Sequence, residues 1–170
     1  GGSTGGIDLT VSGGTPGYQY SWSNGSTLQD LSLIAAGSYS VIVRDLNSCQ
    51  STYQLTVTQP ASLSVSSQVT DVLCNGTATG SVRLSVSGGV PIYRYNWTPS
   101  GDTTRDVQHL TSGNYQVTVT DANSCSVVRS FTVSQPTALA LSASKVDNRC
   151  YGGSSGAIDL TVQGGNTPYS

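Results

Sequence analysis

The chain repeats its own sequence at a fixed interval. Residues 4–14 return in recognisable form at 79–89 and again at 155–165, each time ending in a Gly-Gly pair. A tryptophan, two cysteines and a Gln-Pro pair follow the same period of about 76 residues. Such self-similarity is typical of an array of one structural unit, so we expect a function that an array performs.

The Gln-Pro pairs mark the unit boundaries. Placing a boundary after each pair gives repeats 1–60, 61–136 and 137–170, of which only the middle one is complete. The first lacks a counterpart of 61–74, and the third ends just after its Gly-Gly pair. Because two strands alone cannot bury a core, we expect these residues to be part of a longer polypeptide.

Composition excludes several classes of function. Charged residues make up 9% of the chain, and the net charge is −2. The chain has no basic stripe to neutralise phosphates, which argues against nucleic-acid binding. No apolar run approaches the roughly 20 residues of a membrane span.

The local patterns predict strands throughout. Apolar residues alternate with polar ones in corresponding stretches of the repeats, which indicates strands with one wet face; the clearest positions are Ile7, Leu9, Val11, Val82, Leu84, Val86, Tyr115, Val117 and Val119. Asn24-Gly25 and the Gly-Gly-x-Pro stretches predict turns. The middle repeat is expected to hold strands near 63–65, 81–87, 92–97, 103–110, 114–121 and 126–134.

Short strands at this spacing predict an all-β fold of tandem immunoglobulin-like or fibronectin-like β-sandwich repeats. Trp22 and Trp97 are expected to fill the cores from the third strand. Tyr39 and Tyr115 are expected to begin a later strand, with the hydroxyl tied to backbone.

An ordered set of motifs resembles the SprB repeat family. In the middle repeat these motifs are Cys74-Asn75-Gly76, Ser87-Gly88-Gly89-Val90-Pro91-Ile92-Tyr93-Arg94-Tyr95-Asn96-Trp97, Gly113-Asn114-Tyr115, Asp121-Ala122-Asn123-Ser124-Cys125 and Gln135-Pro136. The resemblance covers the whole chain and departs only in the longer turn at 100–102. It implies a very large cell-surface adhesin of gliding Bacteroidetes, exported by type IX secretion and moved by the gliding machinery.

The resemblance therefore predicts a repeat segment of a secreted adhesin rather than an enzyme, located on the outer surface of the cell. The repeats are expected to form a semi-rigid stalk, because Pro restricts both its own backbone and that of the residue before it. The expected partners are neighbouring repeats, the gliding and secretion machinery, and an external polysaccharide surface. One alternative is that the repeats contact polysaccharide directly, and another is an accessory domain of a secreted hydrolase.

Two cysteines per repeat predict disulfides formed outside the cytoplasm. Two pairings compete: Cys74–Cys125 within a repeat, or Cys49–Cys74 and Cys125–Cys150 across boundaries. An even number of strands between Cys74 and Cys125 would return the chain to the same pole, which favours that pair and leaves the partners of Cys49 and Cys150 outside the sequence. The argument fails if a separate additional strand makes the count odd.

Other candidate sites have ordinary structural interpretations beside the functional one. The aromatic strips Tyr18-Tyr20-Trp22 and Tyr93-Tyr95-Trp97 could contact glycans, although their spacing fits tyrosines that follow a core tryptophan. The repeated Asp-x-Asn turns at 45–47 and 121–123 offer oxygens to Ca²⁺, but too few for a full shell; no other cofactor is expected. Thr103 lies in an Asp-Thr-Thr stretch that resembles an O-glycosylation site, whereas His109 is interpreted as a surface residue.

Overall fold

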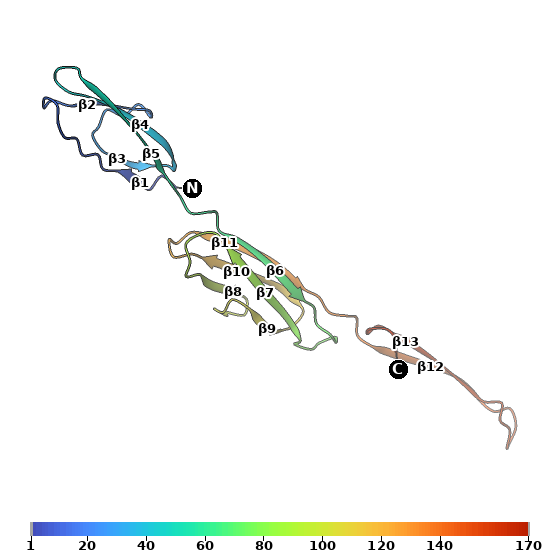
Figure 1. Ribbon diagram of the computed structural model, residues 1–170. Coiled ribbons are helices and arrows are strands. Elements are labelled where there is room, and N and C mark those ends of the chain that lie inside the picture. The colour runs from blue at the N-terminus through green and yellow to red at the C-terminus, as the bar shows by residue number, and fades with distance from the viewer. Residues whose placement is uncertain (1, 170) are drawn as a thin grey trace. The chain divides into compact units, whose positions relative to one another are not determined.

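The computed structural model describes residues 2–169, which form thirteen β-strands and no helix (Figure 1). It divides into two compact units, Gly1–Ser62 and Leu63–Ser170. Within the described range no helix is long and apolar enough to span a membrane. The predicted all-β fold is confirmed.

The middle repeat is a sandwich of two three-stranded antiparallel sheets. One sheet has the order β6-β7-β9 and the other the order β11-β10-β8. In immunoglobulin-like nomenclature these are strands A-B-E and G-F-C, which is the predicted architecture. The strands are β6 (Ser64–Thr70), β7 (Gly80–Ser87), β8 (Arg94–Thr98), β9 (Val107–Leu110), β10 (Gly113–Thr120) and β11 (Ser126–Val133).

Strand register places the loops of this repeat at two opposite poles. At the pole where the chain enters, Ser64 pairs with Ser87, and Thr120 pairs with Ser126. We call this the entry pole; it holds the β7–β8 turn and the β10–β11 turn. At the other pole, which we call the exit pole, Val133 ends β11 and the chain leaves toward the third repeat.

The exit pole is also fixed by hydrogen bonds. It holds the β6–β7 loop, because Thr70 pairs with Ser81. The backbone N–H of Val72 donates to the carbonyl of Ser134 at 2.9 Å, and the N–H of Ser134 donates to Asp71 at 2.8 Å. The segment that leaves the sandwich is therefore bonded to the β6–β7 loop.

The core of the middle repeat lies between its two sheets and is contributed by both. Trp97 is the largest fully buried side chain. Its ring centre lies 5.7 Å from that of Phe131 on β11. The other buried hydrophobic members are Val65, Val72, Val82, Leu84, Val107, Leu110, Tyr115, Val117, Val119 and Val133.

The first repeat forms the same sandwich without a counterpart of β6. Its sheets are β1-β3 and β2-β4-β5, around a core that contains Trp22 and Val41. The predicted strand across residues 7–12 forms only up to Ile7, since no counterpart of β6 is present to pair with the rest. Its strands are β1 (Gly5–Ile7), β2 (Gln19–Trp22), β3 (Leu31–Ile34), β4 (Gly37–Arg44) and β5 (Gln50–Val57).

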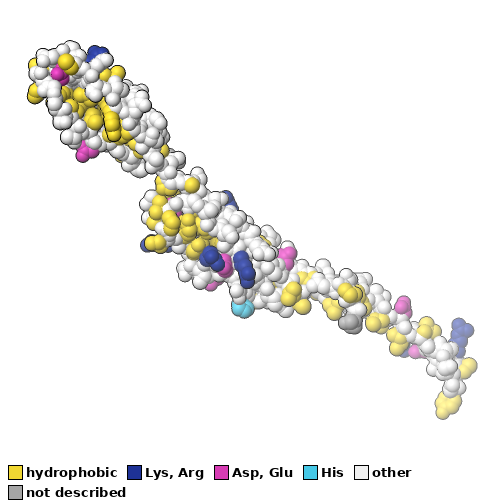
Figure 2. All heavy atoms as spheres, viewed as in Figure 1, with side chains coloured by type: hydrophobic (Ala, Val, Ile, Leu, Met, Phe, Trp, Pro, Cys, Tyr) yellow, Lys and Arg dark blue, Asp and Glu magenta, His cyan; other side chains and the backbone are white. Residues whose placement is uncertain are grey.

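The third repeat is represented by a hairpin of β12 (Ala140–Val146) and β13 (Ala157–Gln163). These strands correspond to β6 and β7. Their apolar side chains remain largely exposed, and yellow hydrophobic atoms appear along this segment in Figure 2.

Candidate functional site

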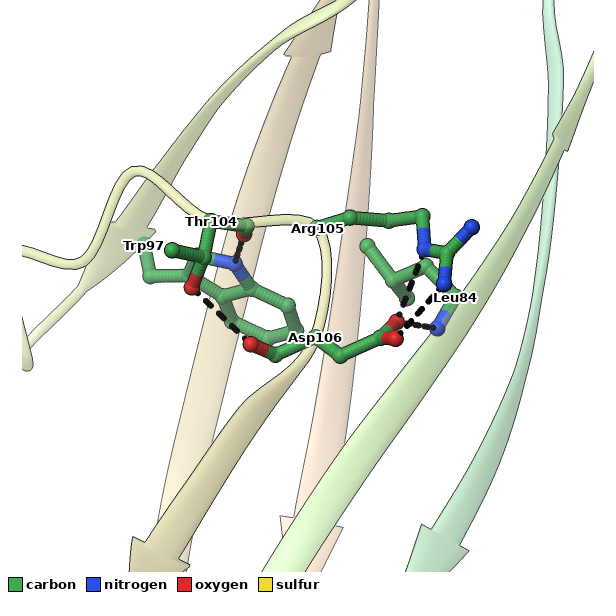
Figure 3. Close-up of polar contacts among 5 residues, drawn as sticks. All are labelled: Leu84, Trp97, Thr104, Arg105 and Asp106. Carbon is green, nitrogen blue, oxygen red and sulfur yellow. Dashed lines mark hydrogen bonds and ion pairs between the residues drawn. The ribbon is translucent and has the colours of Figure 1, made fainter.

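The core tryptophans are held by hydrogen bonds that both repeats make. The indole Nε1 of Trp97 donates to the carbonyl of Thr104 at 2.9 Å (Figure 3), and that of Trp22 donates to the carbonyl of Leu28 at 2.8 Å. Because a buried indole N–H needs an acceptor, this bond fixes the loop that crosses from one sheet to the other. Both side chains are buried, at 1% and 3% exposure, and neither is available to a ligand.

A tyrosine near the start of the penultimate strand of each sandwich ties its hydroxyl to the preceding turn. The hydroxyl of Tyr115 donates to the carbonyl of Thr111 at 3.0 Å, and that of Tyr39 donates to the carbonyl of Ala35 at 2.9 Å. This is the tyrosine corner of immunoglobulin-like domains. Tyr115 is 8% exposed, so its hydroxyl bond is partly shielded from water.

The remaining tyrosines of the aromatic strips are half-buried. The hydroxyls of Tyr18 and Tyr93 each donate at 2.7 Å to the carbonyl of the first glycine of the Gly-Gly turn. Tyr20 and Tyr95 pack against the two cores, and burial raises the pKa of Tyr95. These four side chains are therefore partly packed against their own sandwich and partly exposed.

A polar groove runs over the sheet β6-β7-β9 of the middle repeat. It encloses about 580 Å³ and is lined by residues that include Gln68, Arg83, Arg105 and Gln108. Arg105 forms an ion pair with Asp106 at 2.9 Å, as Figure 3 shows. The hydrogen bond from Arg105, reinforced by the one from the backbone N–H of Leu84, lowers the pKa of Asp106.

At the entry pole, one buried carboxylate holds two turns together. Asp121 is 5% exposed and accepts the backbone N–H of Val90 from the Gly-Gly turn at 2.9 Å. Its other oxygen accepts the N–H groups of Asn123 and Cys125, each at 2.9 Å. These hydrogen bonds lower the pKa of Asp121, and the bond from the N–H of Val90 has the largest effect.

The first repeat builds the same arrangement around Asp45. Its carboxylate accepts the N–H groups of Thr15 at 3.0 Å and Cys49 at 2.9 Å. The bond from Thr15 is the main cause of a lowered pKa for Asp45. The sequence suggested this aspartate as a turn residue or a weak Ca²⁺ ligand; the signal for its role was the recurrence of Asp-x-Asn-x-Cys together with the Gly-Gly turn.

The Asp-x-Asn turns therefore already use their carboxylate oxygens for backbone N–H groups. The Asn47 amide also donates to the Thr15 hydroxyl at 2.9 Å. Within residues 2–169 no cluster of three His, Cys, Asp or Glu side chains is arranged to hold a metal ion. Thr103 and His109 are both exposed, the former in the β8–β9 loop and the latter on β9.

The predicted Cys74–Cys125 disulfide is not supported. All four cysteines are exposed and none is paired. Cys74 lies in the β6–β7 loop at the exit pole, whereas Cys125 lies in the β10–β11 turn at the entry pole. The eight residues of β11 separate the two poles by about 25 Å at roughly 3.3 Å per residue, far beyond the Cα separation that a disulfide tolerates.

The prediction failed because strand counting assumed that every connection reverses the chain. β8 is antiparallel to β10, and β9 is antiparallel to β7. Since β7 and β10 both run from the exit pole to the entry pole, β8 and β9 run in the same direction. The crossing between them does not reverse the chain, so the chain makes three passes between the poles, an odd number, and Cys74 and Cys125 lie at opposite poles.

The cysteines of the alternative pair Cys125–Cys150 also lie far apart. Cys150 lies beyond the far end of the β12–β13 hairpin, past the pair Val146–Ala157. Cys125 lies at the opposite end of the middle repeat. Neither arrangement that the sequence suggested is therefore formed in this unit.

These features define an array of immunoglobulin-like sandwiches in which the same internal hydrogen bonds recur in the first and middle repeats, with no enclosed reactive centre among the described residues. A family model of the SprB repeat matches residues 1–27, 66–102 and 142–170, more than half of the chain. The chain belongs to the SprB repeat family. SprB repeats are segments of cell-surface adhesins rather than catalytic domains, which implies an extracellular location.

Other comparisons add little. The amphioxus IgVJ-C2 molecule, a solved structure, aligns with a TM-score of 0.38 and 10% identity, over 79% of this chain and 98% of that one. No protein of curated function matches the sequence significantly.

Proposed function

We propose that these repeats form the stalk of a SprB-like adhesin that serves attachment and gliding. The observation that carries this proposal is the position of the chain ends in the middle repeat. The chain enters beside Ser64 at one pole and leaves after Val133 at the other. Tandem copies of such a unit extend an array by one sandwich length per copy.

The junction inside the second unit supports a stiff connection. The Asn75 amide donates to the carbonyl of Pro136 at 3.0 Å, and the N–H of Gly76 donates to the side chain of Gln135 at 2.8 Å. The Gln-Pro pair is thus bonded to the exit pole, and Pro restricts the backbone on both sides of the link. In the complete protein the secretion and gliding machinery would pull on this stalk, while a more distal region holds a surface.

Small-angle scattering from chains with two, three and four copies of residues 61–136 tests this function. Each copy is expected to add about 30–40 Å to the maximum dimension, from an eight-residue strand at 3.3 Å per residue plus its turns. Copies that collapse onto one another would add much less and would contradict the stalk.

Direct contact with polysaccharide is a second candidate, favoured by the polar groove that contains Arg83 and Arg105. These cations would suit an acidic glycan. The corresponding residues of the first repeat are Asp8 and Gln29, so the groove is not a constant feature of the array. Saturable binding of an acidic polysaccharide by residues 61–136, lost in Arg83→Ala but retained in Arg94→Ala, would establish this role; no binding to any glycan of a panel would exclude it.

A further inference from the structure

In the middle repeat one cysteine, Cys74, lies at the exit pole and the other, Cys125, lies at the entry pole. This separation suggests that each of them pairs with a cysteine of a neighbouring repeat. Cys74 belongs to the exit pole, beside the segment that begins the next repeat. In the second unit the side-chain amide of Asn166 donates to the carbonyl of Leu73 at 2.9 Å. Cys74 and Asn166 also line a common cavity of about 850 Å³. The exit pole of one repeat therefore contacts the Gly-Gly turn of the following one.

The turn that makes this contact has the same structure as its counterpart in the middle repeat. The hydroxyl of Tyr169 donates to the carbonyl of Gly164 at 2.6 Å, as Tyr93 does to Gly88 at 2.7 Å. Both pairs of glycines have positive φ, 73° and 63° in the third repeat and 70° and 62° in the middle one. Asn166 consequently occupies the position that Val90 occupies in the middle repeat.

Val90 shows what a complete repeat places beside this position. Its N–H is bound by Asp121, and its carbonyl accepts the N–H of Ala122 at 3.2 Å. The same aspartate binds the N–H of Cys125. The turn that carries Cys125 is thus packed on the Gly-Gly turn. Residues 137–169 include that Gly-Gly turn but not the counterpart of the cysteine turn.

We propose that Cys74 forms a disulfide with the counterpart of Cys125 in the repeat that follows it, so that disulfides join successive repeats instead of closing loops inside them. Two thiols lose two protons and two electrons to a disulfide-bearing thiol oxidoreductase, which is reduced to its dithiol as the new S–S bond forms. By the same rule, Cys150 pairs with a cysteine of the repeat that follows it. Cys49 and Cys125 each pair with a cysteine of the preceding repeat. This inference does not depend on what the repeats bind.

Such a bond changes the path along which an array carries tension. Through the bond, β6 of one repeat connects to β11 of the next, and β11 connects through the Gln-Pro link to β6 of the repeat after that. Two such covalent tracks run along the array. The residues between Cys74 and Cys125 lie off both tracks, so their unfolding cannot lengthen the array.

The test uses residues 61–136 as one copy and as two copies in tandem, with Val90→Asn in the second copy to reproduce Asn166. One copy is a fair unit because its buried core draws only on residues 65–133. After oxidation in a glutathione buffer and denaturation, free thiols are counted with a chromogenic disulfide. The single copy is expected to retain both thiols, and the tandem is expected to lose two of its four.

Matched variants identify the bond. Cys74→Ser in the first copy is expected to abolish it, whereas Cys74→Ser in the second copy leaves it intact. Oxidation of the single copy to an internal disulfide would overturn the proposal. So would a folded tandem, judged by tryptophan fluorescence, that keeps four thiols or forms only bonds between chains.

Discussion

Two hairpins of the second unit share one sequence pattern and one register but differ in burial. β6–β7 pairs Ser64 with Ser87, and β12–β13 pairs the corresponding Ala140 with Gln163. Leu84 on β7 is 4% exposed, whereas Leu160 on β13 is 59% exposed. The hairpin therefore forms from its own sequence, while the core requires the opposite sheet β11-β10-β8.

The comparison predicts that completing the third repeat converts its hairpin into a core element. Adding the counterpart of residues 95–136 after Ser170 would cover Leu160 with a second sheet. Because core amides exchange only through larger openings, hydrogen exchange of β13 is expected to slow about 10³-fold or more. Unchanged exchange in β13, with β7 as the internal reference, would show that the hairpin does not template a sandwich.

Matched truncations of the two leucines sharpen the contrast. Leu84→Ala is expected to lower the free energy of unfolding of the middle repeat by about 2–5 kcal/mol, because it leaves a cavity in a packed core. Leu160→Ala removes an exposed side chain and is expected to change it by less than about 0.5 kcal/mol. Urea titration followed by far-ultraviolet circular dichroism measures both; equal effects would contradict the assignment of the core.

The tyrosine corner is expected to contribute less to the free energy of unfolding than Leu84 does, and the β12–β13 hairpin has no such corner. Tyr115→Phe removes the hydroxyl that bonds to Thr111 while keeping the ring. We expect a loss of about 0.5–1.5 kcal/mol in the urea titration, the net value of one hydrogen bond. Tyr151→Phe is the control, since Tyr151 is fully exposed in the third repeat. A loss as large as that of Leu84→Ala would mean that the ring, and not the hydroxyl, had been disturbed.

The aspartate of the entry pole should produce a small pH effect. The pKa of Asp121 is lowered in the folded state, chiefly by the N–H of Val90. Its stabilising contribution is therefore complete above the unfolded value of about 3.9 and is lost as pH falls through the lower folded value. Urea titrations between pH 2 and 6 are expected to show a shallower acid limb in Asp121→Asn.

Asp102→Asn, which changes the net charge equally on an exposed loop, serves as the control for this experiment. If it flattened the acid limb as much as Asp121→Asn does, general charge repulsion rather than the carboxylate at the entry pole would be responsible.

Much of the fold could be predicted because it is encoded by local patterns. Alternation located β7 and β10, and the spacing of Trp97 and Tyr115 placed them correctly in an immunoglobulin-like frame. Residues 8–12 have the same alternation but remain unpaired, since a strand also needs a neighbour. The alternation of a segment does not show whether a neighbouring strand is available to pair with it.

The cysteine arrangement could not be predicted from strand number. It depends on the crossing between β8 and β9, which changes sheet without reversing direction. The loop between Thr98 and Val107 has no sequence signal that distinguishes this crossing from a hairpin. Once the poles were known, the separation of Cys74 from Cys125 followed from register alone.

Force spectroscopy on the two-copy chain tests most directly whether oxidised repeats carry tension through the proposed covalent tracks. In the reduced chain each copy is expected to unfold in one step. The length of that step should approach the extended length of the copy, at about 3.5 Å per residue. In the oxidised chain the disulfide connects β6 of the first copy directly to β11 of the second, so the pulling force passes only through these strands and their flanking residues. The unfolding step of each copy is therefore expected to be absent. Full-length unfolding steps in the oxidised chain would contradict the account.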